Sequence, residues 1–399
     1  MSADAIAGVT PRDVANPGSV DELAGLVREL HAERKPFAFV GGGTELELGN
    51  APHGLDTVIR TSSLDATIEY APEDQTVTVE AGMTFAELDR LLGEHNQMLP
   101  IDVVDRDHAT IGGAIATNAF GRRRQRYGTL KDAIVGITIV RTDGVRARGG
   151  GKVVKNVAGF DIPKLMVGSL GTLGAIVSAT LRVYPVPEAV RAAVLHFDRA
   201  AGVAAATRAL IDRRLEPESV VLYNHSALVV TFAGTPGGVE AQLRVVLDEI
   251  AREAGAVDPA ELSELEREAY EQRERAVRRD GAWRAKITGP PSAPVATLGS
   301  FLAAPPVAVP VAYPLLGIAF EAHADDGDAA GWDVTGLRAH VAEQTAGAGQ
   351  VVLHAMPDAA RGAVDAWPAP PDSFPIMRAL KANFDPHGLC NPGRFIGGI

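Results

Sequence analysis

The sequence predicts an α+β fold with two domains and a C-terminal segment that returns to the first domain. A short apolar run leads into the GGGT motif at 41–44, and a second glycine pair follows in TIGGAIATN at 110–118. Later elements are expected in the order strand, helix, strand, strand, helix, which suits a ferredoxin-like layer. Pro185 and Pro187 close the first half of the chain. The predicted domains are 1–187, 188–370 and 371–399.

The first half alternates short strands with two amphipathic helices. Ser19 is the expected N-cap of a helix over 19–34, whose apolar residues recur at helical spacing. Thr84 and Glu87 have the spacing of a capping box for a helix over 84–95. The Thr-Asp-Gly sequence at 142–144 predicts a hairpin turn. Strands are expected at 37–40, 57–60, 67–70, 76–80, 134–141, 145–148 and 174–184.

The second half is expected to hold the ferredoxin-like layer and a charged helix. Its strands are predicted at 192–197, 219–223, 228–232, 283–288, 307–311 and 316–322. Its helices are predicted at 200–213, 238–254, 259–279 and 292–302. A last helix over 372–383 precedes the turn-rich tail FDPHGLCNPGRF.

Composition excludes several classes of function. The 399 residues are 46% hydrophobic and 22% charged, with a net charge of −12, which argues against nucleic acid and anionic membranes as partners. No apolar run approaches the length of about eighteen residues that suggests a membrane helix, and we expect a cytoplasmic protein. The single cysteine, Cys390, excludes an internal disulfide and a four-thiolate iron–sulfur cluster.

The two glycine loops indicate a phosphate-containing ligand. Glycine has no β-carbon and accepts positive φ, so consecutive amides can converge on one anion. Two such loops suggest a dinucleotide, although glycines also simply make turns. The basic run at 122–126 follows the second loop and is either solvated or faces an anion or an acidic partner. Neither G-x-G-x-x-G nor a P-loop sequence is present, which argues against a Rossmann dehydrogenase and a P-loop NTPase.

An ordered set of motifs resembles the FAD-binding domain of the vanillyl-alcohol-oxidase-type (PCMH-type) proteins. The set runs from GGGT through Glu80-Ala-Gly, Pro100 and TIGGAIATN to GGKVVKNVAGFD at 150–161 and GSLGTLGAI at 168–176. The resemblance covers roughly residues 10–190 and returns in the tail. It implies a two-subdomain FAD-binding domain followed by a ferredoxin-like cap or substrate domain.

KNVAGFD and the short length most resemble the FAD-binding subunit of bacterial glycolate oxidases. Larger relatives that oxidise D-lactate carry a histidine-rich metal signature in their second half. Here His323, His340 and His354 are scattered, so no metal site is expected. This departure puts independent oxidation of a hydroxy acid in doubt.

The resemblance assigns cofactor-binding positions, and FAD is expected to bind without a covalent bond because no His or Cys stands at 41–44. The polar segment at 152–156 is placed near the isoalloxazine, although its lysines could equally be solvated. The implied FAD-binding residues are Gly41, Gly42, Gly43, Thr44, Pro100, Thr110, Ile111, Gly112, Gly113, Ala116, Asn118, Gly171 and Ile176. The implied catalytic residues of the polar segment are Lys152, Lys155 and Asn156.

Other charged residues give weaker candidates. Arg284 and Lys286 alternate on a predicted strand and could bind a substrate carboxylate on one face, or form a surface edge. Asn391 and Arg394 could close the site from the tail. His225 and His387 are interpreted as structural.

Taken with the resemblance, these features predict an FAD-dependent oxidoreductase that acts on a small 2-hydroxy acid such as glycolate. It would be the FAD-binding subunit of a complex with a second flavin subunit and an iron–sulfur subunit, which could hold it at the inner membrane. The alternatives are a non-catalytic FAD-binding or electron-relay subunit, a stand-alone D-lactate-type dehydrogenase, and a flavin subunit of the CO-dehydrogenase class. The last fits GGGT but not KNVAGFD or NPGR.

Overall fold

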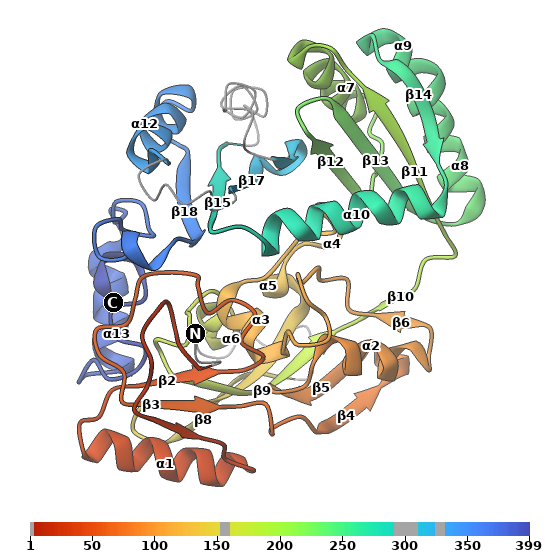
Figure 1. Ribbon diagram of the computed structural model, residues 1–399. Coiled ribbons are helices and arrows are strands. Elements are labelled where there is room, and N and C mark those ends of the chain that lie inside the picture. Colours follow the sequence, from red (N-terminus) through yellow and green to blue (C-terminus); the bar gives the residue numbers. More distant parts are fainter. Residues whose placement is uncertain (1–3, 152–159, 291–309, 324–331) are drawn as a thin grey trace. The chain divides into compact units, whose positions relative to one another are not determined.

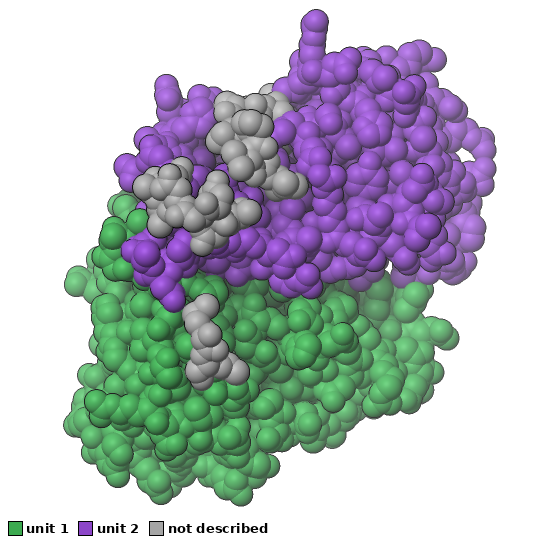
Figure 2. All heavy atoms as spheres, viewed as in Figure 1, with its two compact units in different colours: residues 1–121, 128–186, 361–399 green, residues 122–127, 187–360 purple. Residues whose placement is uncertain are grey.

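The computed structural model describes residues 4–151, 160–290, 310–323 and 332–399. Contacts between residues divide the chain into two compact units, shown in different colours in Figure 2. Unit 1 contains 1–121, 128–186 and 361–399, and unit 2 contains 122–127 and 187–360. Compared with the predicted domains, the segment 122–127 is grouped with unit 2 and 361–370 with unit 1.

Unit 1 is built on two main sheets (Figure 1). The parallel sheet has the order β1-β3-β2 and consists of β1 (Asp13–Ala15), β2 (Phe37–Val40) and β3 (Thr57–Arg60). The antiparallel sheet has the order β4-β5-β9-β7-β8 and consists of β4 (Thr67–Ala71), β5 (Thr76–Glu80), β7 (Ile134–Val140), β8 (Arg146–Gly150) and β9 (Ala175–Arg182). A small pair joins β6 (Gln97–Met98) to β10 (Tyr184–Pro185).

Two helices of unit 1, α1 and α2, begin where the sequence predicts their caps. Ser19 Oγ accepts the amide of Glu22 at 3.2 Å, and Thr84 forms a complete capping box with Glu87. The predicted N-cap and capping box are therefore confirmed. The described helices of this unit are α1 (Val20–Ala32), α2 (Phe85–Gly93), α3 (Ile111–Thr117), α5 (Leu130–Ala133), α6 (Ile162–Met166) and α13 (Phe374–Phe384).

Two hydrophobic cores hold the glycine loops in place. One core joins α1 to residues of both main sheets, including Phe37 of β2 and Val177 of β9. The other packs α2 and α3 on the antiparallel sheet and includes Ile111 at the start of α3. Both the strand that enters 41–44 and the helix that follows Thr110 are thus fixed by burial, which is the main stabilising term in a fold.

Unit 2 is one antiparallel sheet with helices packed on it. The strand order is β14-β11-β13-β12-β16-β17-β15-β18. The strands are β11 (Ala189–His196), β12 (Ser219–Tyr223), β13 (Ala227–Gly234), β14 (Val257–Leu262), β15 (Trp283–Thr288), β16 (Val311–Tyr313), β17 (Ile318–His323) and β18 (Gln350–Ala355). The described helices are α4 (Arg124–Tyr127), α7 (Ala200–Asp212), α8 (Pro236–Val245), α9 (Ala251–Ala254), α10 (Glu264–Arg279) and α12 (Val334–Gln344).

The predicted charged helix over 259–279 is wrong at its beginning. Residues 257–262 form β14, which pairs with β11, and α10 starts only after Ser263. Ser263 and Glu266 form a capping box at that point, so the local signal for the helix start lies four residues after the predicted start at Pro259. The helix α12 and the strand β18 were not anticipated, and the predicted helix over 292–302 lies outside the described residues.

Candidate functional site

The first glycine loop presents main-chain donors at the surface of unit 1. β2 ends at Val40, and the chain turns through 41–44 with Gly42 and Gly43 exposed. Within the described part of the chain, the hydrogen-bond network gives the amides of these four residues no backbone carbonyl to bind. Polar groups of the main chain are normally paired, so an exposed run of open amides is suited to bind an anion.

The two glycine loops lie against each other. A β-carbon on Gly41 would lie 2.1 Å from Thr110 Oγ1, and one on Gly42 would lie 1.6 Å from the carbonyl oxygen of His108. Gly43 has a φ of +74°. Close approach therefore requires glycine at the first two positions, and backbone conformation favours it at the third.

The second loop differs from the expectation that it donates amides to the ligand. The Ile111 amide donates to Met83 O at 2.9 Å, and that of Gly112 donates to Ala81 O at 2.7 Å. The Gly113 amide donates to Thr110 Oγ1 at 3.2 Å, because Thr110 is the N-cap of α3. These donors are used within the protein, and the open amides belong to 41–44.

A third segment, 168–174, packs on the end of α3. The amides of Gly168 and Leu170 donate to Ile115 O at 2.9 Å and Ala116 O at 2.8 Å. Asn118, the C-cap of α3, has a φ of 53°, and Gly171 has a φ of 69°. The helix ends at Asn118, and two hydrogen bonds hold the segment 168–174 to its last turn.

Three polar side-chain atoms in this region have no hydrogen-bond partner among the described residues. They are Asn118 Oδ1, Ser169 Oγ and Asn391 Oδ1. Ser169 is 6% exposed and Asn391 is 4% exposed. Buried polar atoms in native structures are nearly always paired, so these three atoms have hydrogen-bonding capacity left for a polar cofactor such as FAD. Asn118 and Asn391 were singled out from the sequence, whereas Ser169 was not, although it lies within the GSLGTLGAI motif.

Two further predicted FAD-binding residues, Pro100 and Ile176, are part of the protein interior or of a sheet. Pro100 is buried, and Ile176 pairs with Ile139 across the antiparallel sheet. The role that the sequence assigns to each toward FAD stays a prediction.

The tail fixes the turn that follows the first glycine loop. The guanidinium of Arg394 donates to Leu46 O at 3.0 Å and also to Leu48 O, and its own carbonyl accepts Trp367 Nε1 at 2.9 Å. Burial, and to a smaller extent the neighbouring Arg361, lowers the pKa of Arg394 to about 10. Arg394 thus fixes the turn at 46–48, directly after the first glycine loop, through hydrogen bonds to main-chain carbonyls.

Cys390 has no chemistry to offer a flavin. Its side chain is fully buried, and the thiol donates to Gly171 O at 2.9 Å. Burial raises its pKa above the ordinary value, so it stays a neutral thiol.

The candidate catalytic residues are only partly described. Lys152, Lys155 and Asn156 lie outside the described residues. Arg284 and Lys286 lie on β15 in unit 2 and share one face, because they pair with Ala322 and Phe320 of β17. Arg284 is 6% exposed and donates to Arg278 O at 2.6 Å. The guanidinium of Arg284 is therefore held inside the unit and does not form the surface edge that the sequence left open. Its role in binding substrate stays a prediction.

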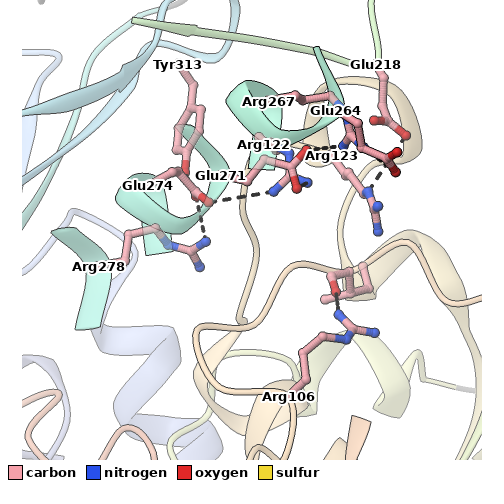
Figure 3. A network of polar contacts seen from close by, with 11 residues as sticks. Arg106, Arg122, Arg123, Glu218, Glu264, Arg267, Glu271, Glu274, Arg278 and Tyr313 are labelled. Carbon is pink, nitrogen blue, oxygen red and sulfur yellow. Dashed lines mark hydrogen bonds and ion pairs between the residues drawn. The ribbon is translucent and has the colours of Figure 1, made fainter. Parts of the chain in front are cut away.

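The basic run at 122–126 meets acidic residues of unit 2 (Figure 3). Arg122 forms an ion pair with Glu271 at 2.7 Å and lies 3.8 Å from Glu274. Glu274 is fully buried, where Arg278 donates to it at 2.8 Å and Tyr313 donates its hydroxyl. The sequence left open whether this run is solvated or faces an anion or an acidic partner. The described contacts favour acidic groups as its partners, and these groups belong to the same chain.

The structure adds two negative findings for its described residues. No cluster of three or more potential metal ligands was found there. Nor does any helix among them have the length and apolar character needed to cross a bilayer.

Comparison with known proteins agrees with the geometry. Residues 11–149 match a family described as FAD binding domain, and 368–395 match the C-terminal domain of FAD linked oxidases. The chain is 36% identical over 177 residues to a D-2-hydroxyglutarate dehydrogenase of Xanthomonas citri pv. viticola, covering 44% of this chain and 38% of that protein. It is 28% identical over 237 residues to glycolate oxidase subunit GlcD of Bacillus subtilis, covering 59% of this chain and 50% of the relative.

Glycolate oxidase subunit GlcE of Escherichia coli is 29% identical over 218 residues, which cover 54% of this chain and 61% of GlcE. Among solved structures, an alkyldihydroxyacetonephosphate synthase has a TM-score of 0.69 at 16% identity, over 96% of this chain and 78% of the other. That likeness concerns the fold alone. The chain spans between 38% and 53% of the length of the first three curated relatives.

Proposed function

Because this chain belongs to the vanillyl-alcohol-oxidase-type (PCMH-type) family of FAD-binding proteins, we propose that it is an FAD-dependent oxidoreductase acting on the CH–OH group of a small 2-hydroxy acid. The observation that carries the proposal is the run of open amides at 41–44, held against Thr110. Relatives whose names are dehydrogenases of D-lactate and D-2-hydroxyglutarate and subunits of glycolate oxidase support the substrate class.

In this proposal the amides of 41–44 hold the diphosphate of FAD without a basic side chain. Hydrogen bonds to a charged group are worth roughly 1.5–3 kcal/mol each, so a few of them are enough to give useful affinity. Asn118, Ser169 and Asn391 supply further polar contacts from their buried, unpartnered atoms. Bound FAD supplies the two-electron acceptor for oxidation of the hydroxyl carbon.

We further propose that Lys152, Lys155 and Asn156 act near the flavin ring and that Arg284 and Lys286 bind the substrate carboxylate. Arginine suits a planar carboxylate, and the bond from Arg284 to Arg278 O restrains the guanidinium in one orientation. Pro100, Ile176 and the second glycine loop shape the cofactor site rather than donate to it. The proposed domains are an FAD-binding domain over 1–187, a cap or substrate domain over 188–370 and a returning segment over 371–399.

We propose glycolate as the substrate to test first, with this chain as one subunit of a glycolate-oxidase-like complex in the cytoplasm. The similarity to both GlcD and GlcE supports this assignment. Cys390 is the only cysteine and is buried, so electrons leaving the flavin would pass to a separate acceptor such as an iron–sulfur subunit. A second flavin subunit completes the proposed assembly.

The test begins with the visible spectrum of the purified chain. Yellow colour that acid precipitation releases into the supernatant is the expected result for noncovalent FAD. Anaerobic titration with glycolate, D-lactate and longer 2-hydroxy acids then follows bleaching of the flavin band. A flavin that no 2-hydroxy acid bleaches would refute the catalytic proposal and leave the electron-relay subunit as the function.

A further inference from the structure

We propose that Lys381 is a positioning residue for the FAD site: it fixes the tail segment 389–391 and the loop 168–174 to each other. The proposal rests on FAD binding in the function proposed above. The residue lies on α13, and its side chain is only 11% exposed. Neither Lys381 nor its partner Asp385 belongs to the residues that the sequence singled out.

The ammonium group of Lys381 uses all three of its donors. It donates to Thr172 O at 2.8 Å, to Cys390 O at 2.9 Å and to Asp385 Oδ2 at 2.6 Å. Thr172 belongs to the GSLGTLGAI segment and Cys390 to the tail, more than two hundred positions away in the chain. One buried cation therefore joins the carbonyls of two distant segments.

Asp385 extends this connection into the tail. Its Oδ2 also accepts the amide of Cys390 at 2.8 Å, and its Oδ1 accepts the amide of Leu389 at 3.1 Å. The carboxylate is 2% exposed, so its charge is balanced mainly by Lys381. The pair thus determines the course of the main chain directly after α13.

The tail segment fixed in this way contacts both parts of the candidate site. Leu389 O accepts the amide of Phe37 and Phe37 O accepts that of Asn391, each at 2.8 Å, which places the tail beside the strand that enters 41–44. On the other side, Cys390 Sγ donates to Gly171 O and Asn391 Nδ2 donates to Leu170 O. Asn391 therefore presents its unpartnered Oδ1 from a segment that Lys381 holds.

A buried ion pair is weak evidence for a role in stability, because desolvation of both charges offsets their attraction. The pair is better suited to select one geometry. Lysine fits here because its tetrahedral ammonium reaches three acceptors in different directions, whereas the planar guanidinium of arginine does not. We therefore expect loss of the Lys381–Asp385 pair to lower the affinity for FAD more than it lowers the free energy of unfolding.

The experiment compares FAD affinity and local protection in the full chain. The double variant Lys381→Met and Asp385→Asn removes both charges, so neither is left buried alone. We expect the dissociation constant for FAD, measured by flavin fluorescence on chain stripped of cofactor, to rise about tenfold or more, the effect of losing one or two charge-assisted contacts. Hydrogen exchange in the stripped chain is expected to speed up in peptides covering 168–174 and 385–394.

A matched control separates positioning from loss of stability. Leu210→Ala opens a cavity beside α7 in unit 2, where Leu210 is buried, and is expected to lower the melting temperature while FAD affinity stays within about twofold of wild type. If the double variant does not fold, Lys381→Arg replaces it, with weaker FAD binding expected because the charge is kept and the geometry is lost. Wild-type affinity in whichever Lys381 variant is measured, or equal weakening in Leu210→Ala, would overturn the proposal.

The proposed function fails in a different way. A wild-type chain that binds FAD but is not bleached by any 2-hydroxy acid refutes the substrate and leaves the Lys381 result valid. A wild-type chain that binds no FAD refutes the proposed function, and then unchanged hydrogen exchange in 168–174 and 385–394 of the double variant refutes the positioning role independently.

Discussion

The hydroxyl oxygen of Thr110 lies 2.1 Å from the place where a β-carbon on Gly41 would stand. This single relationship brings together two loops that are separated in sequence by β3, β4, β5, α2 and β6. It also explains why the first loop is made of glycine: the helix cap that orients α3 occupies the space of a side chain. The amides of 41–44 bind no backbone carbonyl among the described residues, and Gly42 and Gly43 are exposed.

Replacement of Gly42 by alanine is expected to weaken FAD binding strongly. The new β-carbon would lie 1.6 Å from His108 O, a main-chain atom that cannot rotate away, so the loop must move. We expect the FAD dissociation constant to rise by about a hundredfold or more. Gly25→Ala is the matched control, because a β-carbon there meets nothing within 4 Å. A yellow Gly42→Ala protein of normal affinity would contradict the assignment of this loop.

Replacement of Arg122 by methionine is expected to destabilise unit 2. Arg122 is a partner of Glu271 and lies near the fully buried Glu274, so its loss leaves carboxylate charge poorly compensated. Breaking a buried pair costs about 3–5 kcal/mol, whereas removing both partners often costs less. Calorimetry should therefore show a lower melting temperature for Arg122→Met than for Arg122→Met combined with Glu271→Gln, which removes both members of the 2.7 Å pair. The reverse order would mean that the network in Figure 3 does not stabilise the unit.

His354 is expected to make the stability of unit 2 depend on pH. Burial lowers its pKa well below the ordinary value, and Lys286, Arg284 and Arg278 lower it further. Below about pH 6.5 the unfolded chain binds a proton that the folded chain does not, so stability falls as pH falls. The slope for one proton is about 1.4 kcal/mol per pH unit, measurable by urea unfolding. His354→Gln should flatten the curve in this range; identical curves would show that His354 titrates normally.

Cys390 is expected to be inert in the folded protein. Burial raises the pKa of its thiol and its hydrogen bond to Gly171 O occupies the donor, so little thiolate forms near neutral pH. A disulfide reagent that reports thiols should label the native chain slowly and label it fully after denaturation. Rapid labelling of the native chain would contradict the described burial.

Local sequence patterns predicted the parts of the fold that depend on near neighbours. Ser19, Thr84 and Glu87 were identified as caps because each acts within one helical turn, and all three cap as expected. The strand β14 was missed because it pairs with β11, which lies some sixty positions earlier in the chain. Locally, Pro259 and the charged residues after it resemble the start of a helix.

From the sequence alone came the α+β class, the family resemblance, FAD and the loop at 41–44, because glycine content and motif order are properties of the chain itself. Only the tertiary structure decided which donors remain open. The amides of Ile111 and Gly112 are taken by carbonyls of 81–83, Arg122 is taken by Glu271, and Lys381 joins Thr172 to Cys390. The physical reason is that each hydrogen-bonding group binds the partner that folding brings within reach, and that partner is distant in sequence.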